Sequence, residues 1–389
     1  MEVKQIAELM NEVTSEVLGT ENLVQEDLEN IVDVGKAIEN AQAYDKYVKS
    51  LVNHIGKVEY VNRIYSGFAP SVLKDGWEYG SIKEKIAVTK LPEATETWDW
   101  ELQENESYDD NIFTPPNVEA KFFNREVTFT VPISIAERQV KQSFSNPTQL
   151  NSFISMIQTA IKNTMTIKLN KLISMTMCNF IGETIFDEYK DGVSLGTLTS
   201  KSGVKAVNLL YLYNQRYGKS ITAAQSITDP DFIRFAAYTI GMYKDRIAVM
   251  YENFNIGKAD RFTEASRLHS VLLSDFRRAA DVFLQSGTFH EEYTKLVDSE
   301  VVPYWQAPGD KFAFSDITKI NIKTSAGHEV EVSGILGFLW DHEALGVTNM
   351  NQRVKSHYVN SADFTNYWYK MDAGYFNDFN ENAVVFFVA

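Results

Sequence analysis

The segment from Ser145 to Tyr189 restricts the folds open to this chain more than any other part of its sequence. Apolar side chains recur there at helical spacing for roughly ten turns, and they are Leu150, Phe153, Ile154, Ile157, Ile161, Met165, Leu169, Leu172, Ile173, Phe180 and Ile181. Ser145 or Asn146 can cap the start, and proline is tolerated in a first helical turn. The pattern predicts one very long amphipathic helix over 147–189, in which Cys178 is a buried small apolar residue.

Alternating apolar residues on both sides of an acidic stretch predict a long β-hairpin. One strand begins at Ile82, and a second carries Phe123, Val127, Phe129, Val131 and Ile133 at every second or fourth position. Residues 91–119 between them hold nine carboxylates, two adjacent prolines and no lysine or arginine. Arms of about 15 residues would project on the order of 50 Å. Because such a projection cannot bury its own faces, it has to lie on another surface.

The first 45 residues predict two acidic amphipathic helices that break near Gly19 and Thr20. This stretch contains eleven acidic residues and two lysines, and apolar residues still recur in it at helical spacing. A helical arm with so narrow an apolar stripe needs a partner surface. The alternative is an ordinary helical hairpin that packs on the domain's own core.

The remainder of the chain predicts an α+β protein with a mixed unit inserted over residues 200–345. We expect helices over 204–218 and 231–250, a strand and helix over 267–286, and strands over 295–305 and 333–347. Strand alternation returns over 353–376 and in the ending "NENAVVFFVA". That last strand is apolar on both faces, so it requires cover on both sides. We expect it in the same sheet as the strands over 353–376, with the long helix on one face and the arm or a neighbouring subunit on the other.

Charge and cysteine content exclude several classes of function. The formal net charge is -15 and the pI is near 5.0, which argues against a coat that grips nucleic acid through a basic surface. An acidic surface is still compatible with a protein shell that should not adhere to what it encloses. A single cysteine excludes an intramolecular disulfide and a cysteine-based zinc site. With no long apolar run and an acidic start, we expect a soluble protein with no signal peptide and no membrane contact.

No catalytic pattern stands out. The six histidines are scattered, and no two have the one-turn spacing of a helical metal site. We interpret the clusters "DHE" at 341–343 and "HEE" at 290–292 as surface polar residues. One enzyme hypothesis remains, because the acids and aromatics of residues 93–119 resemble a sugar-binding cleft with the paired carboxylates that glycoside hydrolysis needs. The favoured interpretation is a solvated loop whose aromatics dock on a neighbouring subunit.

The order of these elements resembles the major capsid protein of tailed double-stranded DNA bacteriophages, whose subunit has the Hong Kong 97-type fold. Four short sequence segments are similar to segments of capsid proteins from phages that infect Gram-positive hosts: "EDLENIVDVGKAI", "YVKSLVNHIGKVEYVNRIY", "WDHEALGV" and "NYWYKMDAGYFNDFNENAVVFFVA". The resemblance implies an N-terminal arm over 1–60 and an extended loop over 66–126. It implies a peripheral domain over 127–200 and 345–389, with a spine helix over 147–189, and an axial domain over 200–345.

The resemblance further implies a structural protein with no enzymatic activity and no cofactor. It would self-assemble as hexamers and pentamers into the icosahedral head shell of the virion, in the host cytoplasm, around double-stranded DNA that it does not bind by sequence. A separate scaffolding protein and a portal would be partners, and we expect little or no maturation cleavage. A compartment shell protein of the same fold is an alternative. Candidate intersubunit contacts are an acidic, aromatic group and a basic group on the spine helix: Trp98, Trp100, Glu101, Tyr108, Asp109 and Asp110, with Lys162, Lys168 and Lys171.

Overall fold

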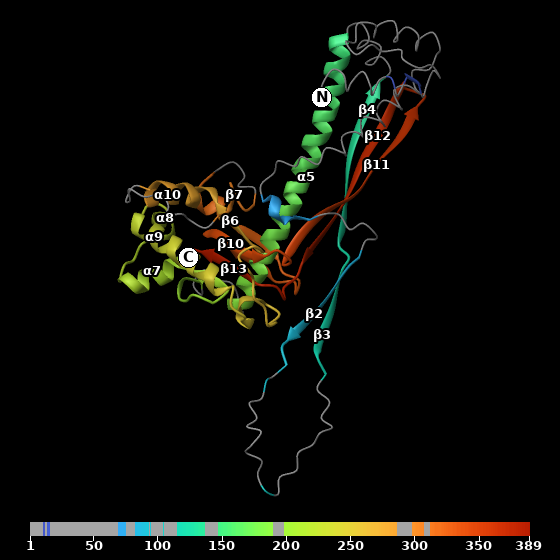
Figure 1. Cartoon of the computed structure of the whole chain (residues 1–389). Helices are drawn as coiled ribbons and strands as arrows, with labels where there is room; N and C mark the ends of the chain where they lie inside the picture. The colour runs from blue at the N-terminus through green and yellow to red at the C-terminus, as the bar shows by residue number, and fades with distance from the viewer. Residues whose placement is uncertain are drawn as a thin grey trace.

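The computed structural model describes residues 11, 14–15, 69–74, 82–92, 94, 104, 115–136, 147–189, 198–285, 298–306 and 312–389. In this part of the chain a long helix and three long strands run side by side and form one limb (Figure 1). A body of shorter helices and strands lies at the foot of the limb, and a narrow hairpin projects away from it. The described residues form an α+β fold, as the sequence predicts.

Helix α5 (Pro147–Tyr189) has 43 residues and is therefore about 65 Å long. Its buried stripe includes Ile161, Leu172, Phe180 and Ile185, each at most 4% exposed. The helix contacts strands of both larger sheets, which explains why one side of it is apolar over so many turns. Cys178 is fully buried, as expected.

The long sheet has the strand order β1-β11-β12-β4. Strands β11 (Leu345–Val359), β12 (Phe364–Asn377) and β4 (Glu126–Ala136) are antiparallel, and the short β1 (Leu73–Lys74) pairs with β11 in parallel. Side chains of β12 alternate between buried and half-buried positions over most of its length. This alternation indicates that one face of the sheet is covered and the other lies near solvent.

The five-stranded sheet has the order β5-β13-β10-β6-β7. Its strands are β5 (Ala206–Asn208), β13 (Ala383–Phe387), β10 (Ile335–Asp341), β6 (Leu268–Leu273) and β7 (Glu300–Val302). Every residue of β5, β10 and β13 is buried. The accompanying helices are α7 (Leu209–Tyr217), α8 (Ala223–Ser226), α9 (Pro230–Arg246) and α10 (Ser274–Gln285).

Smaller elements complete the described chain. Strands β8 (Ile320–Lys323) and β9 (Glu329–Val332) form a hairpin that contacts α5. The one-turn helices are η1 (Pro70–Val72), η2 (Glu252–Phe254) and α11 (Phe314–Ile317). Strands β2 (Lys83–Lys90) and β3 (Asn117–Phe123) form the projecting hairpin. No helix among the described residues combines the length and apolar character needed to cross a membrane.

The pairing of the C-terminal strand corrects the sequence-based prediction. β13 does not join the strands over 353–376; it lies between β5 and β10 in the five-stranded sheet. Cover on both faces is confirmed, since the Phe387 ring lies 6.0 Å from Tyr189 of α5 and the Phe386 ring lies 5.5 Å from Tyr243 of α9. The second cover is thus the subunit's own helix α9. A strand without alternation fits only a sheet that has helices on both faces.

The predicted second strand of the hairpin is also two strands. β3 ends at Phe123 and pairs with β2, whereas β4 begins at Glu126 and pairs with β12. The arms of the described hairpin therefore have eight and seven residues, fewer than the 15 expected. The helix expected over 204–218 begins at Leu209, because Ala206–Asn208 form β5 and the Asn208 side chain caps the helix by accepting from Tyr211 N at 3.1 Å.

Candidate functional site at the base of the hairpin

The β2–β3 hairpin turns its lysines toward the body and most of its large apolar side chains outward, with Glu84 among them, in contrast to an ordinary half-buried hairpin. Lys83, Lys85 and Lys121 are half-buried on the face toward the body of the subunit. The opposite face carries the most exposed apolar side chains of the two strands, with exposed fractions of 65% for Ile86, 41% for Val88, 51% for Val118 and 64% for Phe122. Cross-strand register places Ile86 opposite Ala120 and Val88 opposite Val118, so these side chains share one face.

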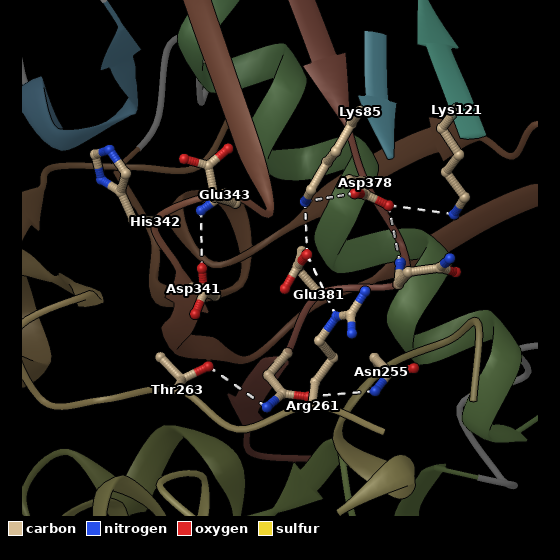
Figure 2. A network of polar contacts seen from close by, with 12 residues as sticks. Lys85, Lys121, Asn255, Arg261, Thr263, Asp341, His342, Glu343, Asp378 and Glu381 are labelled. Carbon is tan, nitrogen blue, oxygen red and sulfur yellow. Dashed lines mark hydrogen bonds and ion pairs between the residues drawn. The ribbon is translucent and has the colours of Figure 1, made fainter. Parts of the chain in front are cut away.

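Two lysines of the hairpin converge on the segment that connects β12 to β13 (Figure 2). Lys85 Nζ lies 2.8 Å from Asp378 Oδ2 and 2.5 Å from Glu381 Oε1. Lys121 Nζ lies 3.2 Å from Asp378 Oδ1. The Asp378 side chain is only 2% exposed, so this carboxylate is a buried bridge between the two strands.

The pKa shifts of Asp378 and Lys85 favour the ionised form of both groups at neutral pH. Burial alone would raise the pKa of Asp378, but the charge of Lys85, its hydrogen bond and the charge of Lys121 outweigh burial and lower it. Burial alone would lower the pKa of Lys85, but Asp378 and Glu381 raise it. A buried ion pair with good geometry is costly to break on one side only, because the remaining charge has no partner.

Hydrogen bonds fix the segment that receives the two lysines. Asp378 Oδ1 accepts from Asn380 N at 3.1 Å, and Asn380 Nδ2 donates to Glu119 Oε2 of β3 at 3.0 Å. Glu381 also lies 3.5 Å from Arg261 Nε. The network therefore holds both hairpin strands and the segment around Arg261 against one short connection.

Behind Glu381, a row of buried amides joins the connection to the body of the subunit. Asn255 Nδ2 donates to Asn382 Oδ1 at 3.3 Å, and Asn382 Nδ2 donates to Thr263 Oγ1 at 3.4 Å (Figure 2). Asn255 and Asn382 are at most 1% exposed. Since buried amides require partners, this row fixes the entry into β13 and with it the position of Glu381.

The edge of β2 that faces away from β3 is tied to residues 252–261. Asp260 N donates to Thr89 O at 2.9 Å, Leu91 N donates to Asp260 Oδ2 at 2.9 Å, and Arg261 Nη1 donates to Val88 O at 2.7 Å. Lys90 forms ion pairs with Asp260 and with Glu252. These bonds fix the direction in which the hairpin leaves the body.

A third group of contacts joins the hairpin to the long sheet. Lys83 Nζ lies 4.0 Å from the centroid of the Phe376 ring and 3.4 Å from Glu343 Oε2. The Phe123 ring lies 5.3 Å from the Phe376 ring. The hairpin base is thus bound to both larger sheets, and its apolar face is presented in a defined orientation.

The structure describes three residues of the predicted contact set. Lys162, Lys168 and Lys171 lie on the exposed side of α5, with Ile167 beside them at 64% exposure. The acidic and aromatic partners, Trp98, Trp100, Glu101, Tyr108, Asp109 and Asp110, lie outside the described residues, as does most of the N-terminal arm. The pairing of these two groups stays a prediction.

Sequence reasoning missed Lys83, Lys85, Lys121 and Asp378 as contact residues. The segment "IKEKIAV" does contain a signal, because Ile82, Ile86 and Val88 occupy even positions. Lys83 and Lys85 occupy odd positions, so in a strand they point to the opposite face. The usual assumption that the apolar face turns inward would have assigned the faces wrongly.

Asp341 corrects a second prediction, because it is only 3% exposed and not a surface residue. Its Oδ1 accepts from Glu343 N at 2.9 Å and lies 3.7 Å from Arg267 Nη2. The neighbouring His342 is half-buried, and its Nδ1 lies 2.8 Å from His269 Nε2. The cluster at 290–292 lies outside the described residues. Within the described part of the chain, no group of three or more histidine, cysteine, aspartate or glutamate side chains is arranged to hold a metal ion.

Chains in solved phage structures are similar to this one. A chain from the structure of the head fiber and inner core protein gp22 of native bacteriophage P68 is similar with a TM-score of 0.51 at 10% identity, over 84% of this chain and 86% of that one. The capsid structure of Staphylococcus phage Andhra is similar with a TM-score of 0.46 at 10% identity, over 84% of each chain. A chain of Microbacterium phage Oxtober96 has a TM-score of 0.45 at 9% identity, over 84% and 92%.

Comparison of the sequence shows the family. A search of the curated proteins found no match. The model of the Phi29-like phage major capsid protein family matches residues 7–387, which is nearly the whole chain. This protein therefore belongs to the Phi29-like phage major capsid proteins, the structural proteins that form the head shell of the virion.

Proposed function

We propose that this subunit assembles as hexamers and pentamers into an icosahedral shell around double-stranded DNA, and that the apolar face of the β2–β3 hairpin docks on a neighbouring copy. The observation that supports this is the reversal of the hairpin faces. Ion pairs hold the polar face to the subunit, while Ile86 and Phe122 on the other face are 65% and 64% exposed. A capsid subunit has other copies of itself as its immediate neighbours, and head-to-tail contacts between unlike patches close into rings.

The magnitude of the exposed surface supports a protein contact. Full burial of one large apolar side chain contributes about 1.5–3 kcal/mol. The four side chains Ile86, Val88, Val118 and Phe122 therefore offer on the order of several kcal/mol when a partner covers them. A two-stranded hairpin without a covered face is marginal in water, so docking also stabilises the hairpin itself.

A second contact concerns charge. Residues 91–119 carry nine carboxylates and no lysine or arginine, and they connect β2 to β3. We assign the exposed lysines of α5, Lys162, Lys168 and Lys171, as their partner on another copy. Trp98, Trp100 and Tyr108 would dock beside them, where Ile167 supplies an apolar neighbour. Opposite charges across such a contact set its register and speed up encounter.

The remaining parts of the proposal follow from the subunit's role in a head shell. A separate scaffolding protein and a portal are the expected partners, and the host is a Gram-positive bacterium. The net charge of -15 lets packed DNA lie against the wall without adhering to it. The role is wholly structural, and the sugar-cleft hypothesis for residues 93–119 gains no support from the comparisons. The division into arm, extended loop, peripheral and axial parts stands as proposed, with β13 reassigned to the sheet of residues 200–345.

Replacing Ile86 and Phe122 together by serine tests the docking face. The expected result is a loss of shells of about tenfold or more in gradient sedimentation and electron microscopy, since each buried contact of about 1.4 kcal/mol changes an association constant tenfold. The melting temperature of the unassembled subunit should stay the same. Val282→Ser is the matched control, because Val282 is 62% exposed on α10 and away from the hairpin. Wild-type shell yield from the double variant would overturn the proposal.

A further inference from the structure

A three-residue turn is one of two short covalent connections between the two larger sheets; the other is the segment from β12 to β13. Strand β10 of the five-stranded sheet ends at Asp341, and β11 of the long sheet begins at Leu345. His342 N donates to Arg267 O at 2.8 Å, and Ala344 N donates to Asp341 O at 2.9 Å. Lys74 Nζ of β1 donates to His342 O at 2.5 Å. These bonds hold the turn against β6 and β1.

A pair of histidines ties the turn to the five-stranded sheet. His269 Nε2 of β6 and His342 Nδ1 lie 2.8 Å apart, which is a hydrogen-bond distance. Such a bond needs a proton on one nitrogen and a lone pair on the other, so at least one imidazole has to be neutral. If both rings carry two protons, the same contact places two N–H groups and two positive charges against each other.

The charged groups around the pair oppose a second positive charge. Two cations face it: Lys74 of β1 and Arg267, which directly precedes β6. The facing anions are Asp341 and Glu343 of the same turn. With neutral histidines these charges balance, and protonation of both rings would leave an excess of positive charge.

The pKa shifts agree with this geometry. Burial, His342 and Lys74 lower the pKa of His269, and burial, Lys74 and Arg267 lower the pKa of His342, with the nearby carboxylates compensating only in part. Burial lowers the pKa of Lys74 itself to about 8. The folded chain therefore favours the uncharged histidine pair at neutral pH.

We propose that His269 and His342 form an acid-sensitive latch on the turn between the two sheets, closed while one ring is neutral and open when both are protonated. Opening removes the side-chain tie between the turn and β6 and leaves the backbone pairing of β6 with β10 intact. The turn between the unit that carries α7–α10 and the limb that carries β11 and β12 is then held less tightly. This latch belongs to the single chain and does not depend on docking by the hairpin.

The direction of the pH dependence follows from the lowered pKa values. A histidine whose pKa is lower in the folded state contributes its stabilisation above its ordinary value of 6.5. The contribution is lost as pH falls below that value toward the folded pKa. The latch is therefore closed at neutral pH and opens on the acid side.

Hydrogen exchange of the full-length subunit at about pH 7.5 and about pH 5 tests the latch. After correction for the intrinsic effect of pH, amides 342–344 should exchange about tenfold faster at the lower pH. Amides of β13 should not change, because that strand is not part of the turn. Equal exchange at both pH values, or an equal increase in β13, would overturn the proposal.

Variants separate the latch from a general effect of acid. His342→Gln should remove the pH response of amides 342–344, because glutamine does not gain a charge. His357→Gln is the matched control, since His357 is exposed on β11, and it should keep the full response. Arg267→Gln should move the response to higher pH, because one opposing cation is lost and Asp341 is freed. If His342→Gln does not fold, the test rests on Arg267→Gln. In that variant, amides 342–344 that respond at the same pH as in the wild type would overturn the proposal.

Discussion

Lys85 Nζ and Asp378 Oδ2 are 2.8 Å apart, although the two residues are separated by most of the length of the chain. Lys85 belongs to the projecting hairpin, and Asp378 follows the last strand of the long sheet. The pair makes the orientation of the hairpin a property of the folded subunit. A neighbouring copy would meet an apolar face that is already in place, which lowers the entropy cost of docking.

Breaking this ion pair on one side should be costly. Asp378→Asn leaves Lys85 and Lys121 without their shared carboxylate, and we expect a loss of about 3–5 kcal/mol in the free energy of unfolding. Denaturant unfolding of the unassembled subunit measures it. The matched control is Asp372→Asn, which breaks a more exposed pair with Arg353 on the long sheet and should cost about 1 kcal/mol or less. Equal losses in both variants would contradict a buried role for Asp378.

Protonation of the Asp378 carboxylate should destabilise the folded subunit in acid. The pKa of Asp378 is lowered in the folded state, so its contribution is complete above its ordinary value of 3.8 and is lost as pH falls through the folded value. Unfolding free energy measured against pH should fall more steeply in this acid range for the wild type than for Asp378→Asn. Parallel curves for the two proteins would show that Asp378 does not carry the effect. This window begins at 3.8, whereas the window of the histidine latch begins at 6.5.

Gly334 should not tolerate alanine. Its φ of +86° is in the left-handed region, and an added Cβ would lie 1.9 Å from Val388 O. Gly327 has a φ of +88° with open space around it, so Gly327→Ala is a control for backbone strain alone. We expect about 1–2 kcal/mol for Gly327→Ala and clearly more for Gly334→Ala, measured by denaturant unfolding. Equal costs would mean that the chain after β13 moves away from Gly334 without loss.

Truncation after Asn382 should abolish folding, not only assembly. The deletion removes β13, which joins β5 to β10 and packs on α5 and α9. Circular dichroism during heating should show no cooperative transition. Phe386→Ala is a milder test of the same packing and should cost about 3–5 kcal/mol. A truncated subunit that stays soluble and unfolds cooperatively would show the strand to be dispensable.

Reversing the charge of Lys162, Lys168 and Lys171 together to glutamate should weaken shell assembly and make it less sensitive to salt. Salt screens the attraction between these lysines and the acidic loop in the wild type. The glutamates replace that attraction with repulsion, so added salt should no longer weaken assembly. Shell yield across a salt series measures both effects. Reversal of Lys201, Lys323 and Lys355, which are exposed on other elements, gives the same change in net charge as a control. Unchanged yield and salt response in the first triple variant would exclude this pairing.

Patterns that repeat over many residues predicted the fold well. The stripe of α5 is set by one helix lying along two sheets, and its bounds of Pro147 and Tyr189 match the prediction. The sheet of β13 could not be read from its own residues, because an apolar strand shows that it is covered but not which strands flank it. The break at Asn124 and Arg125 was missed because the alternation continues through it.

The contact residues at the hairpin base were harder to predict for a related reason. No local sequence pattern marks Lys85 or Asp378, because they come into contact only when two distant segments of the chain fold together. The buried state of Asp341 depends on Glu343 N and Arg267, which no local pattern indicates. Exposure of Lys162, Lys168 and Lys171 followed directly from helical geometry, since they lie opposite the buried stripe.

The strand order β5-β13-β10-β6-β7 also has a consequence for the timing of synthesis. β13 is the last of these five strands to leave the ribosome, yet β5 pairs with no other described strand. At about 5–20 residues per second, β5 waits on the order of ten seconds or longer for its partner. The completed sheet, and with it the anchor for the hairpin at Asp378 and Glu381, therefore forms only after all five strands have been synthesised, which delays any association that depends on the hairpin.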